Sequence, residues 1–268
     1  MGEQVQLFES FVQKYPRLIA PNSISEDWKQ FMTEIFHHGE ANVQTLHEFI
    51  QETPEIRTLP RKEDIWAFTN FCPAPEKTKV IIIGQDPYSR DDVGYGLGFS
   101  VKKSSPITPS LENILKEVQC DISDSIYANN LRGFTDGGPR HGCLDYWAKQ
   151  GVVFLDTALT VEIGKPTSHI GKGWEPIIAS IIEKLQICVE RDGGKLVLIL
   201  WGSEARNNFR DCISENHMVL EGGHPSPLNE YDNFLGRRYF SEANDFLVEA
   251  GREPIDWSLD EDEDEARN

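Results

Sequence analysis

The chain has 268 residues, 39% of them hydrophobic and 10% aromatic, and carries a formal net charge of −18. This length and hydrophobic content suffice for one sizeable core, so we expect a single domain over residues 1–257. No apolar run is long enough to span a membrane, and the first residues do not resemble a secretory signal. These features favour an intracellular protein, nuclear or cytoplasmic, without a membrane partner.

The first 68 residues are expected to form a helical N-terminal part of this domain. Apolar residues recur there at helical spacing, as in Leu7, Phe8, Phe11 and Val12. Five scattered cysteines form no Cys-x-x-Cys pair, which indicates reduced thiols rather than a disulfide framework. We therefore expect no metal and no cofactor.

Four apolar runs then predict buried strands, at residues 80–83, 152–156, 196–201 and 218–220. Helical patterns separate or follow these runs, at residues 110–118, 144–150, 174–189, 203–209 and 239–250. Strands that alternate with helices predict right-handed crossovers and a parallel sheet. The expected fold class is α/β, with three layers, α/β/α, and a central four-stranded parallel twisted sheet.

An acidic run closes the chain. Residues 256–268 hold seven acidic residues and one arginine, which together contribute −6 and leave −12 for the rest. Such a block of like charge predicts that residues 258–268 form a disordered tail, which either keeps the protein in solution or contacts a protein partner. With −12 on the remaining chain, contacts to nucleic acid must use a few focused cations and backbone N–H groups.

A turn directly after the first predicted strand carries the most informative residues. Gly84 allows a sharp change of direction and Pro87 fixes the path beyond it. Gln85, Asp86 and Tyr88 are thereby presented at the carboxyl end of a strand, where open α/β sheets place their active sites. An acid, an amide and an aromatic ring at one turn suggest catalysis on a flat, polar ring.

The other predicted strands also end in polar residues. Asp156 ends the second, Gly202 and Ser203 follow the third, and His224 follows the fourth. Each of these residues alone is more often structural than functional. Four such strand ends in one chain favour a shared pocket, because the carboxyl ends of parallel strands meet at one edge of the sheet.

In these motifs the chain resembles the family-1 uracil-DNA glycosylases, from about residue 58 to residue 257. The matching segments include Gly-Gln-Asp-Pro-Tyr at 84–88, Gly-Leu-Gly-Phe-Ser-Val at 96–101, Pro-Ser-Leu-Glu-Asn-Ile at 109–114, Leu-Trp-Gly-Ser at 200–203 and His-Pro-Ser-Pro-Leu at 224–228. So many motifs, in order and at near-family spacing, make the resemblance specific.

The resemblance implies a monofunctional DNA glycosylase of base excision repair. Such an enzyme hydrolyses the bond between a flipped-out uracil and deoxyribose, in single- and double-stranded DNA, and leaves an abasic site. By this resemblance Asp86 positions water or stabilises the sugar cation, and His224 donates a hydrogen bond to O2 of the departing base. We expect the protein to act as a monomer.

The same resemblance implies the remaining site residues. Phe99 stacks on the base, Gln85 contacts its ring and Tyr88 excludes a 5-methyl group. Leu228 pushes into the duplex to fill the space that the base vacates. The residues that contact the DNA backbone are then Pro109, Ser110, Ser203 and Ser226.

Two positions depart from the family pattern. Ser89 stands where the family has histidine, which can reduce the grip on phosphate, although Arg90 follows and could compensate. Asp156 stands where the family has the asparagine that reads the base edge. Ionised Asp156 cannot donate to uracil O4 but can accept from the N4 amino group of cytosine, whereas protonated Asp156 satisfies either base.

Three hypotheses therefore remain. The first is a uracil-DNA glycosylase that tolerates Asp156 through protonation or a shifted pose. The second is a glycosylase for cytosine or a modified pyrimidine. The third is a non-catalytic relative that binds DNA or protein. Intact Asp86 and His224 favour the two enzymatic hypotheses.

Overall fold

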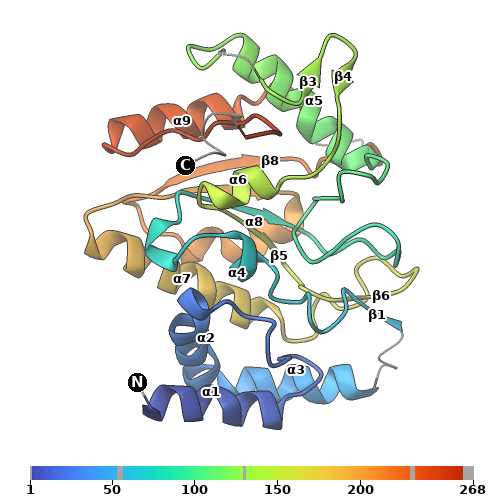
Figure 1. Cartoon of the computed structure of the whole chain (residues 1–268), viewed down its shortest axis with the longest axis vertical. Helices are drawn as coiled ribbons and strands as arrows, with labels where there is room; N and C mark the ends of the chain where they lie inside the picture. The colour runs from blue at the N-terminus through green and yellow to red at the C-terminus, as the bar shows by residue number, and fades with distance from the viewer. Residues whose placement is uncertain (1, 53–56, 129–130, 230–232, 262–268) are drawn as a thin grey trace.

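A four-stranded parallel sheet forms the centre of the protein. The computed structural model describes residues 2–52, 57–128, 131–229 and 233–261 (Figure 1). The strand order is β5-β2-β7-β8, and every neighbouring pair is parallel. The four strands are β2 (Val80–Gly84), β5 (Val152–Asp156), β7 (Val197–Trp201) and β8 (Met218–Gly222). The predicted strands are confirmed, with ends displaced by two residues or fewer.

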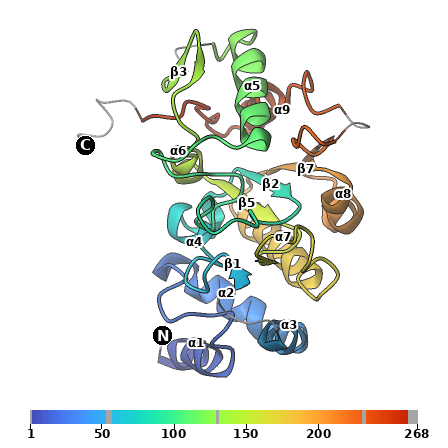
Figure 2. The same cartoon turned by 90° about the vertical axis from the view of Figure 1, so that its right-hand side faces the viewer.

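Helices cover both faces of this sheet. On one face lie α5 (Pro109–Ser123) and α9 (Tyr239–Glu249), and on the other lies α7 (Glu175–Arg191) (Figures 1 and 2). Because helices cover both faces, all residues of β2, β5 and β7 are buried, which explains their continuous apolar sequence. The expected three-layer α/β/α architecture is thereby confirmed.

The N-terminal helices add a further layer beneath α7 (Figure 2). They are α1 (Gly2–Lys14), α2 (Glu26–His38) and α3 (Glu40–Glu52). Aromatic rings join this layer to the body: Phe36 contacts Trp66 with ring centroids 5.4 Å apart, and Trp66 contacts Trp174 at 5.6 Å. None of the helices that the structure describes is both long and apolar enough to cross a membrane.

Several short elements connect these layers. Within the first 68 residues, β1 (Thr58–Leu59) departs from the helical prediction, because its residues pair with the distant strand β6 (Val161–Glu162). A small hairpin contains β3 (Phe134–Thr135) and β4 (Gly138–Pro139). The remaining short helices are α4 (Phe68–Phe71), α6 (Asp145–Lys149) and α8 (Ser203–Phe209), with 3-10 turns at Pro75–Lys77 and Arg210–Cys212.

The start of the acidic C-terminal segment packs against the body, unlike the predicted tail. Ser258 and Leu259 are buried. Asp260 forms an ion pair with Lys103 (2.6 Å), and Glu261 forms one with Lys149. Basic side chains far away in the sequence therefore offset the like-charge repulsion that predicted disorder from residue 258. The rest of the predicted tail, 262–268, lies outside the described residues.

Candidate active site

A cleft of about 760 Å³ opens at the carboxyl ends of β2, β7 and β8. The sequence-predicted residues that line it are Gln85, Asp86, Tyr88, Phe99, Ser110, Ser203, His224, Ser226 and Leu228. Two predicted residues lie outside this lining: Pro109 is exposed at the start of α5, and Asp156 lines a smaller pocket next to the cleft. One cleft therefore brings together most of the predicted site.

Asp86 lies just beyond β2, at the turn that Gly84 begins. Its Oδ2 accepts a hydrogen bond from the Thr167 backbone N–H (2.5 Å), and its Oδ1 accepts one from Gln85 Nε2 (3.2 Å). Burial raises the pKa of Asp86, while these two hydrogen bonds oppose the rise because they favour the charged form. Thr167 adopts a φ of 66°, a left-handed conformation that is uncommon for a residue other than glycine.

His224 follows β8 and is neutral at physiological pH. Its Nδ1 accepts a hydrogen bond from the Ser226 backbone N–H (3.1 Å), so the proton of the neutral ring lies on Nε2. Burial lowers the pKa of His224 to about 4. Gly202 gives the ring room, since a Cβ at that position would lie 3.2 Å from Cβ of His224. The imidazole is thus a neutral hydrogen-bond donor at the cleft.

Two aromatic side chains have fixed positions in the wall of the cleft. Phe99 packs edge-on against Trp201, with ring centroids 5.4 Å apart. The Tyr88 hydroxyl donates to the backbone oxygen of Phe99 (2.7 Å) and shares a second hydrogen bond with Thr108 Oγ1 (2.7 Å). Burial raises the pKa of Tyr88, which keeps its hydroxyl protonated. These contacts prevent the Tyr88 ring from swinging out of the wall.

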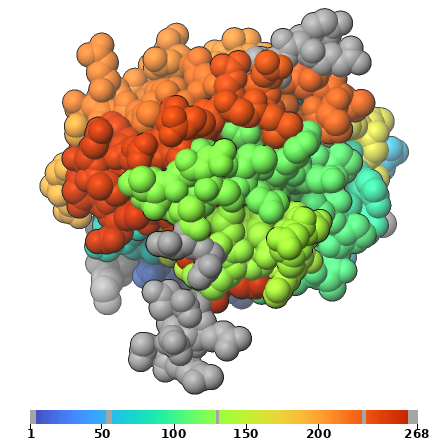
Figure 3. Space-filling model, turned by 90° about the horizontal axis from the view of Figure 1, so that it is seen from above, coloured from blue at the N-terminus to red at the C-terminus, as the bar shows by residue number. Residues whose placement is uncertain are grey.

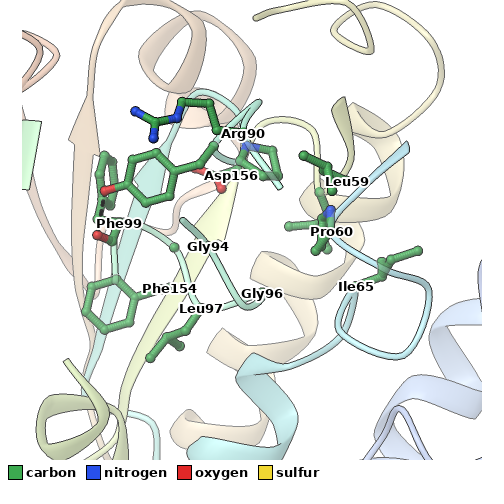
Figure 4. A pocket seen from close by; sticks show the side chains of 14 residues that line it. Leu59, Pro60, Ile65, Arg90, Gly94, Gly96, Leu97, Phe99, Phe154 and Asp156 are labelled. Atoms are coloured by element: carbon green, nitrogen blue, oxygen red, sulfur yellow. Dashed lines mark hydrogen bonds between the residues drawn. The ribbon is translucent and has the colours of Figure 1, made fainter. Parts of the chain in front are cut away.

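Asp156 ends β5 and lies beside Gly84, its partner in the parallel register. The side chain lines a pocket of about 40 Å³ that shares Tyr88 and Phe99 with the cleft, and Figure 4 shows it between Phe99 on one side and Leu59 on the other. Asp156 is 5% exposed, and within the described residues its carboxylate accepts no hydrogen bond. Burial, with a contribution from the charge of Asp86, raises the pKa of Asp156 to about 8.

The polar residues at the rim come from helix starts and from the segment after β8. Ser110 is the second residue of α5, and Ser203 is the first residue of α8. Helix starts leave backbone N–H groups free for an anion. Leu228, in contrast, is 89% exposed, which is unusual for a large apolar side chain and suits a contact outside the protein.

Three residues at this site were not predicted from the sequence. Arg206 lines the cleft one helical turn after Ser203, a spacing that could have revealed it. Asn229 also lines it, and its Nδ2 donates to the backbone oxygen of His224 (3.2 Å). Thr167 had no sequence signal, because its contact with Asp86 joins two loops that are far apart along the chain. Within the described residues, no cluster of three or more His, Cys, Asp or Glu suits a metal ion.

The chain is similar in sequence to known proteins. The family described as the uracil DNA glycosylase superfamily matches residues 71–248. The uracil-DNA glycosylase of Deinococcus radiodurans is 39% identical over 265 residues, which cover 97% of each chain. That of Coxiella burnetii strain CbuK_Q154 is 38% identical over 239 residues, 88% of this chain and 96% of the relative.

Solved structures agree in fold. The mimivirus uracil-DNA glycosylase superposes with a TM-score of 0.69 at 22% identity, over 93% of both chains. The UNG of Nitratifractor salsuginis superposes with a TM-score of 0.56 at 17% identity, over 94% of this chain and 98% of that one. At these identities the likeness concerns the fold alone.

Proposed function

The chain belongs to the uracil-DNA glycosylase superfamily, and from that premise we propose that it hydrolyses the N-glycosidic bond of uracil in DNA and leaves an abasic site. Such a reaction is the first step of base excision repair, and we propose that the enzyme is a monofunctional glycosylase. One observation carries the proposal: a single cleft contains the Asp86 carboxylate, the neutral imidazole of His224 and the ring of Phe99. Their chemistry fits a flipped-out base that lies on Phe99, with its sugar near Asp86 and its O2 near His224.

We assign Asp86 to the sugar side of the reaction. Positive charge develops on the sugar as the bond to the base breaks, and a fixed carboxylate stabilises that charge or orients the attacking water. The Thr167 N–H and the Gln85 amide favour the ionised carboxylate and hold its orientation. Thr167 is therefore a positioning residue, which acts through Asp86.

We assign His224 to the departing base, which leaves with the bonding electron pair and becomes an anion. A donor that is already in place stabilises this charge without reorganisation. Because the Ser226 N–H occupies Nδ1, the Nε2–H is the donor available to O2 of the base. The imidazole is uncharged and need not lose a proton, so it acts over the whole neutral range of pH.

We propose that Asp156 recognises uracil while its own carboxyl group is protonated and neutral. Its hydroxyl donates to O4 of the base and its carbonyl oxygen accepts from N3–H, as an amide would. Asp86 has two hydrogen-bond donors and ionises first, whereas Asp156 has none and keeps its proton. Two acids whose environments separate their pKa values in this way can take different roles.

The other groups near Asp156 do not offset the rise in its pKa that burial causes. Tyr88 is protonated and uncharged. Arg90 lines the same small pocket (Figure 4), but its guanidinium pairs with Asp92 at 3.1 Å. His224, across the cleft, is neutral. The negative charge of Asp86 acts against ionisation of Asp156, so the neutral form prevails at physiological pH.

DNA contacts in this proposal depend on few charges. The hydroxyls of Ser110, Ser203 and Ser226 and the backbone N–H groups at the starts of α5 and α8 hold phosphates. Arg206 adds one cation at the cleft. Leu228 enters the duplex and offsets the loss of stacking, about a few kcal/mol. Ser89, where the resemblance expects histidine, supplies no charge to the phosphates. We also propose that residues 1–257 form one domain and act as a monomer.

A second candidate is excision of cytosine or a modified pyrimidine, and the unpartnered carboxyl of Asp156 favours it. Neutral Asp156 can donate to cytosine N3 and accept from its N4 amino group, and ionised Asp156 can still accept from that amino group. Uracil loses the donor to O4 once Asp156 ionises. The two candidates therefore differ in their response to alkaline pH.

The test uses oligonucleotides with a single uracil, cytosine, thymine or 5-modified pyrimidine, followed by alkaline cleavage of abasic sites. The proposal predicts cleavage at uracil by the wild type and an approximately 10³-fold loss in Asp86→Ala, in line with the loss of a group that acts on the reacting atoms. Full activity of Asp86→Ala would remove Asp86 from the mechanism. Cleavage at cytosine without cleavage at uracil would select the second candidate.

A further inference from the structure

The hydroxyl of Tyr88 is held from two separate segments of the chain. It donates to the backbone oxygen of Phe99 (2.7 Å), a carbonyl that can only accept. Its single proton is thereby used, so the hydroxyl of Thr108, 2.7 Å away, is the donor in the second hydrogen bond. Thr108 therefore supplies a contact that the Phe99 carbonyl cannot replace.

Thr108 itself is fixed to the start of helix α5, of which it is the N-cap residue. Its Oγ1 accepts from the backbone N–H of Leu111 (3.4 Å), and its backbone oxygen accepts from that of Glu112 (2.8 Å). Leu111 is fully buried, and Figure 3 shows the C-terminal third of the chain, in orange and red, lying along the green segment that contains α5. Thr108 thus holds the Tyr88 hydroxyl from a helix that is packed into the body of the protein.

Packing alone does not fix the Tyr88 ring. The ring lines both the cleft and the small pocket of about 40 Å³ beside Asp156. Gly94 also lines that pocket and leaves space next to the ring, since a Cβ on Gly94 would be 3.3 Å from Cδ2 of Tyr88. A ring that borders a cavity is held less firmly by packing, so the two hydrogen bonds of its hydroxyl decide where it lies.

We propose that Thr108 is the positioning residue for Tyr88: its hydrogen bond keeps the ring against the 5-position of the base and thereby sets the discrimination between uracil and thymine. This inference rests on the proposed function, in which the Tyr88 ring excludes a 5-methyl group. Without the Thr108 hydroxyl, only the Phe99 carbonyl holds the tip of the ring, and a methyl group can press the ring toward the small pocket. Uracil has no such methyl group, so its excision depends little on this contact.

The measurement is the ratio of kcat/KM for uracil to kcat/KM for thymine, on single-stranded oligonucleotides that carry one such base. Thr108→Val keeps the shape of the side chain and removes the hydroxyl. We expect the ratio to fall by about fivefold, as for the loss of one hydrogen bond, while kcat/KM for uracil stays within about twofold of the wild type. Thr108→Ser retains the hydroxyl and should restore the wild-type ratio.

Tyr88→Phe supplies a second readout of the same contact. It removes the hydroxyl that Thr108 contacts, together with the hydrogen bond to Phe99. The ratio for Tyr88→Phe should therefore be no higher than that for Thr108→Val. Adding Thr108→Val to Tyr88→Phe should lower the ratio no further, because the hydrogen bond is already lost.

Thr33→Val is the matched control. Thr33 is a buried threonine of α2, and its hydroxyl donates to the backbone oxygen of Lys29 (2.6 Å) within that helix. This variant also loses a threonine hydroxyl, so it should lower the melting temperature and leave the ratio of uracil to thymine excision unchanged. If Thr108→Val does not fold, Thr108→Ala, which also lacks the hydroxyl, is judged by the same ratio.

The inference is wrong if the Thr108 variant cleaves at thymine no more than the wild type does, or if its activities on uracil and thymine fall in parallel. It is also wrong if Thr108→Ser does not restore the ratio, if Thr33→Val lowers it equally, or if the effects of Thr108→Val and Tyr88→Phe on the ratio multiply. Failure of the proposed function is a separate result, because the wild type would then release no uracil from the uracil oligonucleotide.

Discussion

The carboxylate of Asp156 lies directly beside Gly84, and a Cβ on Gly84 would be 2.5 Å from Asp156 Oδ1. The two residues are partners on adjacent parallel strands, at the edge of the sheet where the cleft opens. The same Cβ would be 2.6 Å from the ring of Phe99. The glycine that starts the turn toward Asp86 therefore also makes room for the side chains that are proposed to hold the base.

Gly84→Ala should accordingly disrupt the base pocket. The added methyl group collides with Asp156 and with Phe99, and neither neighbour is the end of a long flexible side chain. Such overpacking costs about 1–3 kcal/mol of folding stability. We expect a lower melting temperature and a loss of kcat/KM for uracil of more than about tenfold. Unchanged kinetics would show that the base does not lie against this edge.

His224→Ala should lower kcat much more than it raises KM. The Nε2–H is proposed to stabilise charge that appears only as the base departs, and the loss of one such donor costs about 10²–10³-fold in kcat. Steady-state kinetics on a single-stranded uracil oligonucleotide measure both constants. An equal change in kcat for His224→Ala and for a distant surface substitution such as Gln30→Ala would contradict the role.

Tyr88→Ala should admit thymine. The Tyr88 ring separates the cleft from the small pocket beside Asp156, and two hydrogen bonds of 2.7 Å keep it in place. Removing the ring joins the two spaces and creates room for a 5-methyl group. The measurement is alkaline cleavage of an oligonucleotide with one thymine, for wild type and variant. Tyr88→Phe keeps the ring but loses both hydrogen bonds of the hydroxyl, so it should cleave at thymine far less than Tyr88→Ala does.

The sequence predicted the parts of this site that depend on short segments. The strands follow from their continuous apolar runs, and Gln85, Asp86 and Tyr88 follow from the glycine turn after β2. Thr167 was not foreseen, because its backbone N–H reaches Asp86 from a loop that is far away along the chain. The prediction of disorder for residues 258–261 was wrong for a related reason. Lys103 and Lys149, which form ion pairs with this segment, are distant in sequence.

Stability should also depend on Asp156. Its pKa is raised from an ordinary value of 3.8 to about 8, so between these values the folded protein binds a proton that the unfolded chain releases. Its contribution to stability is then full below about pH 4 and is lost as the pH rises toward 8. Across this range we expect the free energy of unfolding of the wild type to decrease relative to that of Asp156→Asn. Parallel curves in urea denaturation at pH 5 and pH 8 would contradict a buried, proton-bearing Asp156.

The pH profile of uracil excision tests the central claim most directly. Neutral Asp156 donates to O4 of uracil, so kcat/KM of the wild type should fall above about pH 8, by about tenfold per pH unit. Asp156→Asn keeps a donor at every pH and should show no such fall up to about pH 9. A wild-type profile that stays flat to about pH 9, or that Asp156→Asn reproduces, would contradict the assignment of Asp156 as a neutral reader of uracil.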